Sequence, residues 1–306
     1  MRIVAALGGN ALLRRGELMT AENQRANIRR AAVALGELAA AGHSLVITHG
    51  NGPQVGLLAL QAAASPESPF PLDVLDAESA GMIGYVLQQE LGNIVEDGLF
   101  ATLLTQVRVD PRDPAFANPT KPIGPVYDEV TARKLATERG WQIAPDNDKW
   151  RRVVASPKPL EIMEVEVLNF LMERGVIVIC AGGGGIPVVE LDSGSLTGIE
   201  AVIDKDLASS LLAQQLDADL LLLLTDVEAV YLNWGTLKAQ ALGHVAVSDL
   251  SLEEFAIGSM RPKIEAAMAF ARSMGKPAAI GRLEDAAAIV NGTRGTWINS
   301  NMLPCS

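Results

Sequence analysis

The chain has 306 residues, of which 49% are hydrophobic, so it can bury the core of one large α/β domain or two smaller ones. Its formal net charge of −11 at pH 7 argues against nucleic acid or an acidic membrane as a partner, because both require a broad basic face. Any anionic substrate must therefore be held by a few local lysines or arginines.

The cysteine and histidine content argues for a reducing compartment and against a metal site built by the protein. The two cysteines, Cys180 and Cys305, offer no disulfide framework, and the three histidines are scattered along the chain. The first residues are typical of a strand and not of a signal peptide, and no apolar run is long enough to span a bilayer. We therefore expect a cytoplasmic protein without a membrane segment.

Apolar segments of strand length alternate with helical segments along most of the chain. The pattern predicts strands at residues 3–7, 45–48, 101–107, 176–180, 220–225 and 278–281, with a further edge strand at 295–298. It predicts helices at residues 21–41, 54–64, 75–97, 161–174, 204–216 and 262–274. Thr20 is suited to cap the first of these helices, and Gly42 is suited to end it. Such alternation predicts a largely parallel sheet with helices on both faces.

One segment, residues 108–159, interrupts this alternation. It contains eight of the 16 prolines of the chain, few apolar runs and a charged turn at residues 146–149. So dense a proline cluster predicts an inserted, irregular subdomain that lies outside the sheet.

Three of the expected strands run directly into glycine-rich loops, at residues 7–10, 48–53 and 180–187. A backbone without side chains lets amide groups approach a ligand closely, and phosphate is the ligand that such loops most often take. Because the carboxyl ends of parallel strands meet at one edge of a sheet, the three loops together predict a phosphate-rich ligand lying across several strands.

Three lysines are candidates for holding phosphate, and each also has a more ordinary explanation. Lys121 lies between prolines that stiffen its loop, or it is simply a solvated loop lysine. Lys205, between Asp204 and Asp206 at a helix start, fits the transferring group with Asp206 fixing its direction, or it supplies ordinary first-turn charge. Lys263 lies in the first turn of another helix and fits a phosphate site, although surface lysines are also common there.

These features predict phosphoryl transfer, which requires a protein mainly to align the reactants and to place positive charge around the moving phosphoryl group. The sequence has no Walker A loop, no protein-kinase signature and no dinucleotide-binding glycine spacing. A different kinase architecture is therefore expected.

Seven long motifs follow one another along the chain in the order of one known family. They are ALGGNAL (6–12), THGNGPQVG (48–56), LDAESAGMIGY (75–85), PTKPIGP (119–125), WRRVV (150–154), GGGGIPV (182–188) and EAVIDKDLA (200–208). So many long motifs in family order make chance similarity implausible: nearly the whole chain resembles the amino acid kinase family, and within it the branch that phosphorylates carbamate. The chain departs from the family pattern at residues 147–149, at Ala155 and at Leu237.

The resemblance implies a single domain over residues 1–306, with a three-layer αβα fold around a mainly parallel sheet of about eight strands. The proline-rich segment would be a small subdomain that protrudes over the active site like a lid. The implied reaction interconverts ATP and carbamate with ADP and carbamoyl phosphate, and Mg²⁺ would be carried by the nucleotide. A homodimer is also implied. The same site serves ATP formation in arginine breakdown and the supply of carbamoyl phosphate.

The resemblance also assigns roles to individual residues. Lys121 and Lys205 would contact the phosphoryl group, Asp206 would orient the lysines, and Lys263 would reach the nucleotide phosphates. The small-substrate end would be lined by Gly9, Asn10, Gly50 and Asn51. The nucleotide would be bordered by Gly182, Gly183, Gly184, Gly185, Thr225, Asp226, Val227, Tyr231 and Met260.

Two other functions stay open from the sequence alone. A related phosphotransferase of the same fold, acting on a small acyl acceptor or a nucleotide phosphate, would need a larger pocket and usually a further cation, which the acceptor-side loops do not offer. A non-catalytic nucleotide sensor would be expected to lack Lys121, Lys205 or Asp206, and the chain has all three.

Overall fold

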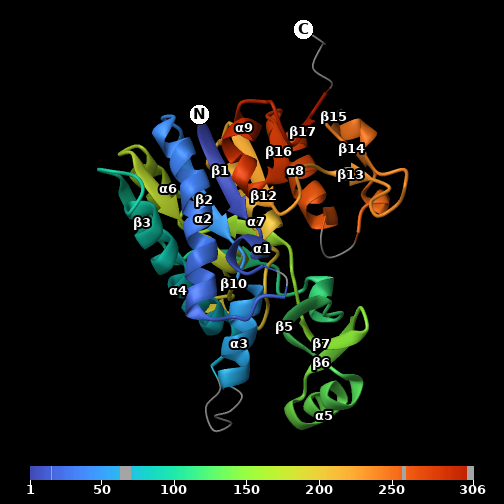
Figure 1. The fold of residues 1–306 in the computed structure, drawn as a ribbon. Helices are drawn as coiled ribbons and strands as arrows, with labels where there is room; N and C mark the ends of the chain where they lie inside the picture. The colour runs from blue at the N-terminus through green and yellow to red at the C-terminus, as the bar shows by residue number, and fades with distance from the viewer. Residues whose placement is uncertain (15, 63–69, 257–259, 302–306) are drawn as a thin grey trace.

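The computed structural model describes residues 1–14, 16–62, 70–256 and 260–301 of the chain (Figure 1). Its central sheet consists of β1 (Arg2–Leu7), β2 (Ser44–His49), β3 (Leu99–Thr102), β9 (Val176–Ile179), β12 (Leu220–Thr225), β15 (His244–Ala246), β16 (Ala278–Arg282) and β17 (Thr296–Asn299). These eight strands lie in the order β15-β17-β16-β12-β1-β2-β9-β3. Neighbouring strands run parallel throughout, except that β16 and β17 are antiparallel.

Helices cover both faces of this sheet (Figure 1). One face packs against α2 (Ala21–Ala40), α4 (Leu72–Gly92) and α9 (Ala286–Val290), and the other packs against α6 (Val165–Met172), α7 (Lys205–Gln215) and α8 (Met260–Met274). Side chains alternate along β1, because Ile3, Ala5 and Leu7 are buried in the first core whereas Val4 and Ala6 are buried in the second. The predicted three-layer αβα fold with an eight-stranded, mainly parallel sheet is confirmed.

The predicted limits of the first long helix are confirmed to within one residue. Thr20 Oγ1 accepts a hydrogen bond from the Asn23 main-chain N–H at 3.2 Å, as an N-cap does. Gly42 follows the helix with a φ of +79°, in the left-handed region that favours glycine. The part of the chain that the structure describes also contains α1 (Gly9–Leu12), α3 (Gly52–Ala62), β13 (Tyr231–Leu232), β14 (Gln240–Ala241) and five 3₁₀ helices at Pro114–Phe116, Gly182–Gly184, Val247–Asp249, Leu252–Glu254 and Leu283–Asp285.

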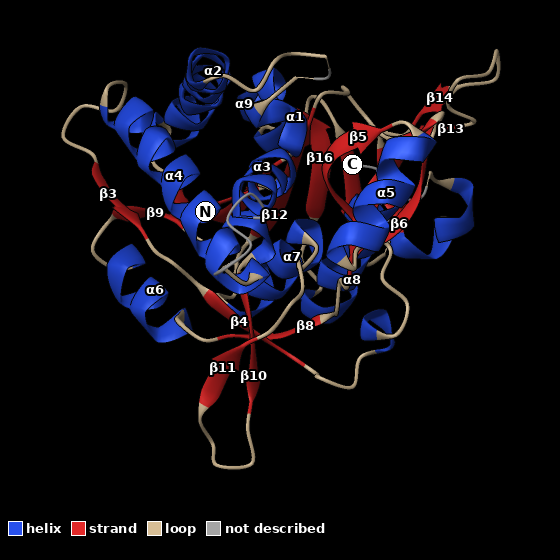
Figure 2. Cartoon of the chain, turned by 90° about the horizontal axis from the view of Figure 1, so that it is seen from below, coloured by secondary structure: helices blue, strands red, loops and turns tan. Residues whose placement is uncertain are grey.

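The strand predicted at residues 101–107 is wrong as one element, because the chain changes sheets within it. Strand β3 ends at Thr102, and β4 (Gln106–Val109) belongs to a second sheet with β8 (Pro159–Ile162), β10 (Ile186–Glu190) and β11 (Leu196–Gly198). Thr105 lies at the change of sheet, where its Oγ1 accepts a hydrogen bond from the Ala181 N–H at 3.1 Å. The β10–β11 hairpin projects from the body of the molecule (Figure 2).

Other boundaries also differ from the prediction. The helix expected at residues 75–97 runs from Leu72 to Gly92, and the one expected at residues 54–64 runs from Gly52 to Ala62. The helix expected at residues 161–174 begins only at Val165, because Glu161 and Ile162 pair with β4 as part of β8. Strand β17 is not the edge of the main sheet, since the short strand β15 pairs along its outer side.

The proline-rich insertion is regular, contrary to the prediction. It contains β5 (Lys121–Tyr127), α5 (Glu129–Arg139), β6 (Gln142–Asp146) and β7 (Lys149–Val154), and its three strands form an antiparallel sheet in the order β5-β7-β6. The strand prolines Pro122, Pro125 and Pro145 all lie on the two edge strands, where a missing N–H disturbs no central pairing. A high proline content is therefore compatible with this small sheet.

The inserted subdomain packs directly on the body of the molecule. Strand β5 lies so close to α3 that a Cβ atom built on Gly56 would be 2.0 Å from the Gly124 Cα. At the other end of the insertion, the Val202 N–H donates to the Ala155 carbonyl at 3.0 Å.

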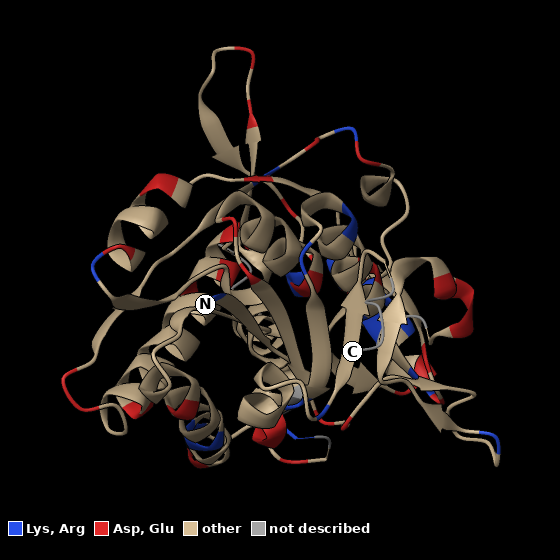
Figure 3. Ribbon diagram, turned by 90° about the horizontal axis from the view of Figure 1, so that it is seen from above, with Lys and Arg blue, Asp and Glu red and all other residues tan. Residues whose placement is uncertain are grey.

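Figure 3 shows acidic positions, coloured red, on many of the outer helices and loops, in keeping with the net charge of −11. Every helix in the described part of the chain is too short or too polar to cross a membrane.

Candidate active site

Two carboxylates at the start of α7 bring three lysines from distant parts of the chain together. Asp204 is the N-cap of α7, and its Oδ1 accepts a hydrogen bond from the Asp206 N–H at 2.9 Å. Its other oxygen, Oδ2, accepts from Lys121 Nζ at 2.6 Å, although the two residues are 83 positions apart. Asp204 therefore both caps α7 and holds Lys121 of the inserted subdomain. Its sequence context does not reveal this second role.

Asp206 joins the other two lysines. Its Oδ1 lies 2.5 Å from Lys205 Nζ and its Oδ2 lies 3.1 Å from Lys263 Nζ. The side chains of Asp206, Lys205 and Lys263 are only 5%, 11% and 13% exposed, so their charges interact through the protein interior. The four charged residues predicted as site residues, Lys121, Lys205, Asp206 and Lys263, thus lie in one cluster.

The charges in this cluster shift one another's pKa values. Burial alone would raise the pKa of Asp206, but the charges of Lys205 and Lys263 hold it well below its ordinary value. Burial lowers the pKa of Lys205, and the Asp206 charge opposes this effect only in part. Burial would also lower the pKa of Lys263, but the charge and hydrogen bond of Asp206, together with the charges of Asp204 and Asp226, outweigh it and raise that pKa. Asp206 is therefore ionised throughout the physiological range.

The first two glycine loops lie beside this cluster. The Gly8 N–H donates to the Leu224 carbonyl at 2.9 Å, which places the first loop at the end of β12. A Cβ atom on Gly50 would be 3.5 Å from the Gly9 nitrogen and 3.6 Å from Lys205 Cδ, so the two loops and Lys205 are neighbours. Gly9 is exposed, and a Cβ atom there would meet nothing within 4 Å. The side chain of Asn10 lies outside the described residues.

The sequence pattern attributes the glycines of the third loop to the close approach of a ligand, but the structure gives a different reason for them. Gly182, Gly183, Gly184 and Gly185 are all buried, and a Cβ atom on any of them would be 2.6 Å or less from another protein group. Gly182 would meet the His49 ring at 2.5 Å, and Gly184 the Ile203 carbonyl oxygen at 2.5 Å. Close packing within the protein therefore already requires these glycines, and contact between their amides and a ligand stays a prediction.

The residues predicted to border the nucleoside extend from the end of β12 to the start of α8; they are Thr225, Asp226, Val227, Tyr231 and Met260. Asp226 lies near the lysine cluster, since its charge helps to raise the pKa of Lys263. Tyr231 lies in the β13–β14 hairpin, where its hydroxyl donates to Glu228 Oε1 at 2.5 Å and its ring is 5.0 Å from that of Trp234. Tyr231 thus contacts Glu228, just before the hairpin, and Trp234 within it.

Two buried polar residues, one within the second loop and one beside it on α4, were not predicted as site residues. His49 is 1% exposed, and burial lowers its pKa to about 4, so its imidazole is neutral. Asp76 is 1% exposed, and its Oδ1 accepts a hydrogen bond from Asn51 Nδ2 at 2.8 Å. Asp76 lies in the family motif at residues 75–85, but only the placement of α4 against the loop reveals its contact with Asn51.

No group of three or more metal-ligating side chains converges within the described ranges. Mg²⁺ commonly binds one or two carboxylates together with substrate phosphates and water, so it does not need such a group. Asp204 and Asp226 lie close to the lysines that would hold those phosphates. The residues present therefore fit a magnesium ion carried by a nucleotide.

The fold and the site together define a phosphate-handling αβα protein whose lysines gather at the carboxyl ends of parallel strands. The chain belongs to the amino acid kinase family, whose sequence profile matches residues 1–282.

Its relatives and structural neighbours share nearly the full length of the chain. It is 57% identical over 300 residues to carbamate kinase from Haemophilus influenzae, covering 97% of this chain and 96% of that protein. It is 46% identical over 310 residues to carbamate kinase from Pyrococcus horikoshii, covering 97% and 98%. The structure of carbamate kinase from Giardia lamblia bound to AMP-PNP superimposes with a TM-score of 0.89 at 40% identity, covering 97% and 98%.

The positions that depart from the family pattern have simple structural settings. Asn147 lies in the β6–β7 turn with a φ of +56°, and asparagine tolerates this left-handed conformation better than most residues do. Ala155 is 5% exposed where the insertion rejoins the body, and Leu237 is fully exposed. None of these residues belongs to the lysine cluster.

Proposed function

We propose that the protein is a carbamate kinase, which transfers a phosphoryl group between ATP and carbamate. The observation that carries this proposal is the convergence of Lys121, Lys205 and Lys263 on Asp204 and Asp206. The full-length similarity to carbamate kinases of diverse organisms supports the choice of carbamate as the acceptor.

The reaction needs positive charge and alignment more than it needs a base. In the direction of ATP synthesis, a terminal phosphate oxygen of ADP bonds to the phosphorus of carbamoyl phosphate. The phosphorus–oxygen bond to carbamate breaks, and carbamate leaves as an anion. No proton moves in this step, so catalysis rests on charge stabilisation and positioning.

The ionisation states at the site agree with this chemistry. Both oxygens of Asp206 already contact lysines, and its lowered pKa makes it a poor proton acceptor. Lys121 and Lys205 would neutralise the transferring group, Asp206 would direct Lys205 and Lys263, and Lys263 would hold the nucleotide phosphates. Mg²⁺ bound by those phosphates would supply further charge neutralisation.

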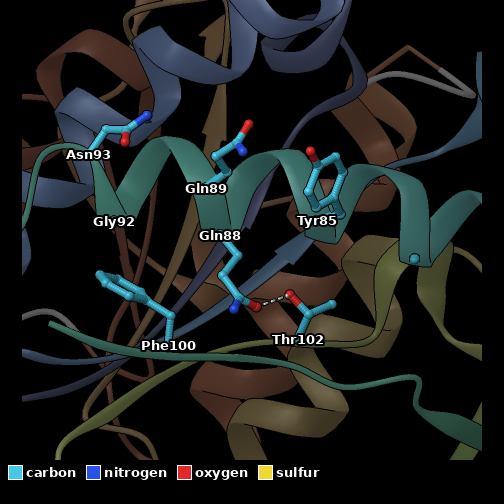
Figure 4. Close-up of a pocket in the computed structure, with 8 residues that line it drawn as sticks. Tyr85, Gln88, Gln89, Gly92, Asn93, Phe100 and Thr102 are labelled. Carbon is cyan, nitrogen blue, oxygen red and sulfur yellow. Dashed lines mark hydrogen bonds between the residues drawn. The ribbon is translucent and has the colours of Figure 1, made fainter.

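The open edge of the main sheet supports a homodimer. Strand β3 is one of the two edge strands, and beside it the outer face of α4 exposes Met82 and Tyr85, which are 40% and 59% accessible. Helix α4 and strand β3 border a hollow of about 540 Å³ lined by Gly81, Tyr85, Gln88, Gln89, Gly92, Asn93, Phe100 and Thr102 (Figure 4). A second copy would cover this face, and sedimentation velocity measures the resulting mass.

We further propose that the enzyme works in the cytoplasm, where ATP is available.

A coupled assay tests the proposed function. Purified protein with Mg²⁺ and ADP is offered carbamoyl phosphate, and separately acetyl phosphate as a probe of acyl-acceptor kinases. We expect ATP formation with a clear preference for carbamoyl phosphate. A preference for acetyl phosphate would favour the acyl-acceptor alternative, and ADP binding without turnover on either compound would favour a nucleotide sensor.

A further inference from the structure

The side-chain amide of Asn51 is held by two partners on α4. Its Nδ2 donates to Asp76 Oδ1 at 2.8 Å and to Ser79 Oγ, also at 2.8 Å. All three residues are buried, with exposures of 2%, 1% and 0% for Asn51, Asp76 and Ser79. Both amide hydrogens are therefore used, and the carbonyl Oδ1 is the polar atom that faces away from α4.

This network allows only one orientation of the Asn51 amide. The Ser79 hydroxyl donates its single hydrogen to the Asp76 main-chain carbonyl at 3.0 Å, so towards Asn51 it can only accept. A flipped amide would place the Asn51 carbonyl against this hydroxyl oxygen, where two acceptors would face each other. The Ser79 hydroxyl thus selects this orientation whatever the protonation state of Asp76, and the amide is fixed in a buried environment where unpaired polar groups are unfavourable.

The other side of Asn51 faces the third glycine loop, here called the tetraglycine loop because of its four glycines at residues 182–185. A Cβ atom on Gly183 would be 2.2 Å from Asn51 Nδ2 and 2.6 Å from its Oδ1, so the amide lies directly against the Gly183 backbone. Asn51 therefore lies between α4 and this loop. Its neighbour in sequence, Gly50, is the residue that approaches Gly9 and Lys205.

We propose that Asp76 and Ser79 are positioning residues for phosphoryl transfer, which by holding Asn51 fix Gly50 beside Lys205. The proposal rests on the proposed function, since it assigns the Gly50–Asn51 loop to the acceptor. Misplacement of reacting groups by about 1 Å can lower a rate by about 100-fold, so a buried anchor behind the loop affects turnover without touching substrate.

The tetraglycine loop, which is predicted to border the nucleotide, is also held by contacts that do not involve α4. Changes in the kinetics with carbamoyl phosphate can therefore be separated from changes in ADP affinity. Thr105 Oγ1 accepts from the Ala181 N–H at 3.1 Å, and Gly184 packs against Ile203. Loss of the α4 anchors should therefore disturb the acceptor loop far more than the nucleotide side.

Three variants and a control test this role. Asp76→Leu removes the acceptor for Asn51, Asp76→Asn keeps an acceptor oxygen at the same place, and Ser79→Ala removes the second anchor. Glu78→Gln, at an exposed position on the same helix, is the control. The measured quantities are kcat/KM for carbamoyl phosphate in ATP synthesis and the ADP dissociation constant by calorimetry.

We expect Asp76→Leu to lower kcat/KM for carbamoyl phosphate by about 10- to 100-fold. Ser79→Ala, which loses one neutral hydrogen bond, should lower it by about 3- to 10-fold. Asp76→Asn and Glu78→Gln should stay within about threefold of the wild type, and ADP affinity should be unchanged within about twofold in every variant.

Two results would overturn the positioning role: folded variants with wild-type kcat/KM, or an equal loss of ADP affinity and acceptor kinetics, which marks a purely structural network. Asp76→Asn behaving like Asp76→Leu would also overturn it, because the retained acceptor would then be irrelevant. If Asp76→Leu does not fold, the kcat/KM and ADP affinity of Ser79→Ala decide whether the positioning role holds.

The failure of the proposed function looks different from the failure of the positioning role. A wild-type enzyme that is inactive on carbamoyl phosphate contradicts the proposed function itself. An active wild type with equally active variants contradicts only the positioning role.

Discussion

Replacing Asp206 by asparagine is the sharpest perturbation of the lysine cluster. The change keeps the size of the side chain and removes the one negative charge that contacts both Lys205 and Lys263. Two ammonium groups that are 11% and 13% exposed then lose their shared counter-ion. Removing one partner of a buried ion pair typically destabilises a protein by about 3–5 kcal/mol. We expect a loss of that size in the free energy of unfolding of the ligand-free protein.

Urea unfolding followed by circular dichroism measures this loss. Asp217→Asn is the matched control, because the Asp217–Lys276 pair has a 2.6 Å contact but an Asp217 side chain that is 75% exposed. Exposed pairs contribute about 0–1 kcal/mol, so the control should stay within that range. Added sulfate should stabilise Asp206→Asn more than the wild type, because an anion can replace the missing charge.

The pH dependence of the Asp206→Asn effect has a definite sign. The folded-state pKa of Asp206 is lowered, because the lysine charges outweigh burial, so its stabilisation is fully present above the unfolded pKa of about 4. It is lost only as pH falls through the lower folded value. The difference between variant and wild type should stay constant from pH 8 to about 4 and shrink below that. A loss no greater than that of the Asp217 control, with no added response to sulfate, would refute this account of the cluster.

Other predictions address individual residues and the insertion. Lys205→Ala should lower turnover by about two to four orders of magnitude with little change in the circular dichroism spectrum, and retention of a tenth of the activity would remove Lys205 from the chemistry. Lys263→Ala should weaken ADP binding by about 1–3 kcal/mol in calorimetry, and unchanged affinity would make Lys263 an ordinary helix lysine. Burial, with added repulsion from Asp73 and Glu200, raises the pKa of Asp76, so Asp76→Asn should be more stable than the wild type above about pH 4, with a gain that grows as pH rises and is absent below. Hydrogen exchange in residues 108–159 should slow more with ADP and a carbamoyl phosphate analogue together than with ADP alone, and equal protection in free and liganded protein would mean a fixed insertion.

The layers of the fold follow from local sequence pattern, whereas sheet membership does not. Runs such as β1 and β12 have strand length and are almost wholly apolar, and helical segments alternate with such runs along most of the chain, which is enough to predict a parallel sheet covered on both faces. The strand-like run at residues 101–107 looks continuous, yet its two halves pair with different strands, β9 and β10. Hydrogen-bond partners are a property of the assembled fold, so periodicity along one segment cannot reveal them.

The sequence likewise reveals some features of the candidate site, while others appear only in the fold. Its lysines and glycines stand out in the sequence because their types and neighbours are unusual, and the family resemblance connects them. The Lys121–Asp204 contact spans 83 positions and exists only because the insertion packs back onto α3. The glycines at 182–185 show what a glycine-rich sequence cannot predict. A missing side chain indicates that another group comes close, but not whether that group is a ligand or the protein itself. Here the nearest neighbours include His49 and Asn51.

Phosphorus-31 magnetic resonance of the wild-type enzyme tests the central claim most directly. With Mg²⁺ and ADP present, the carbamoyl phosphate signal should fall while the γ-phosphate signal of ATP rises by the same amount, because the lysine cluster passes the phosphoryl group from one substrate to the other. A carbamoyl phosphate signal that decays only into inorganic phosphate at the uncatalysed rate, with no ATP formed, would contradict the assignment of this site to phosphoryl transfer.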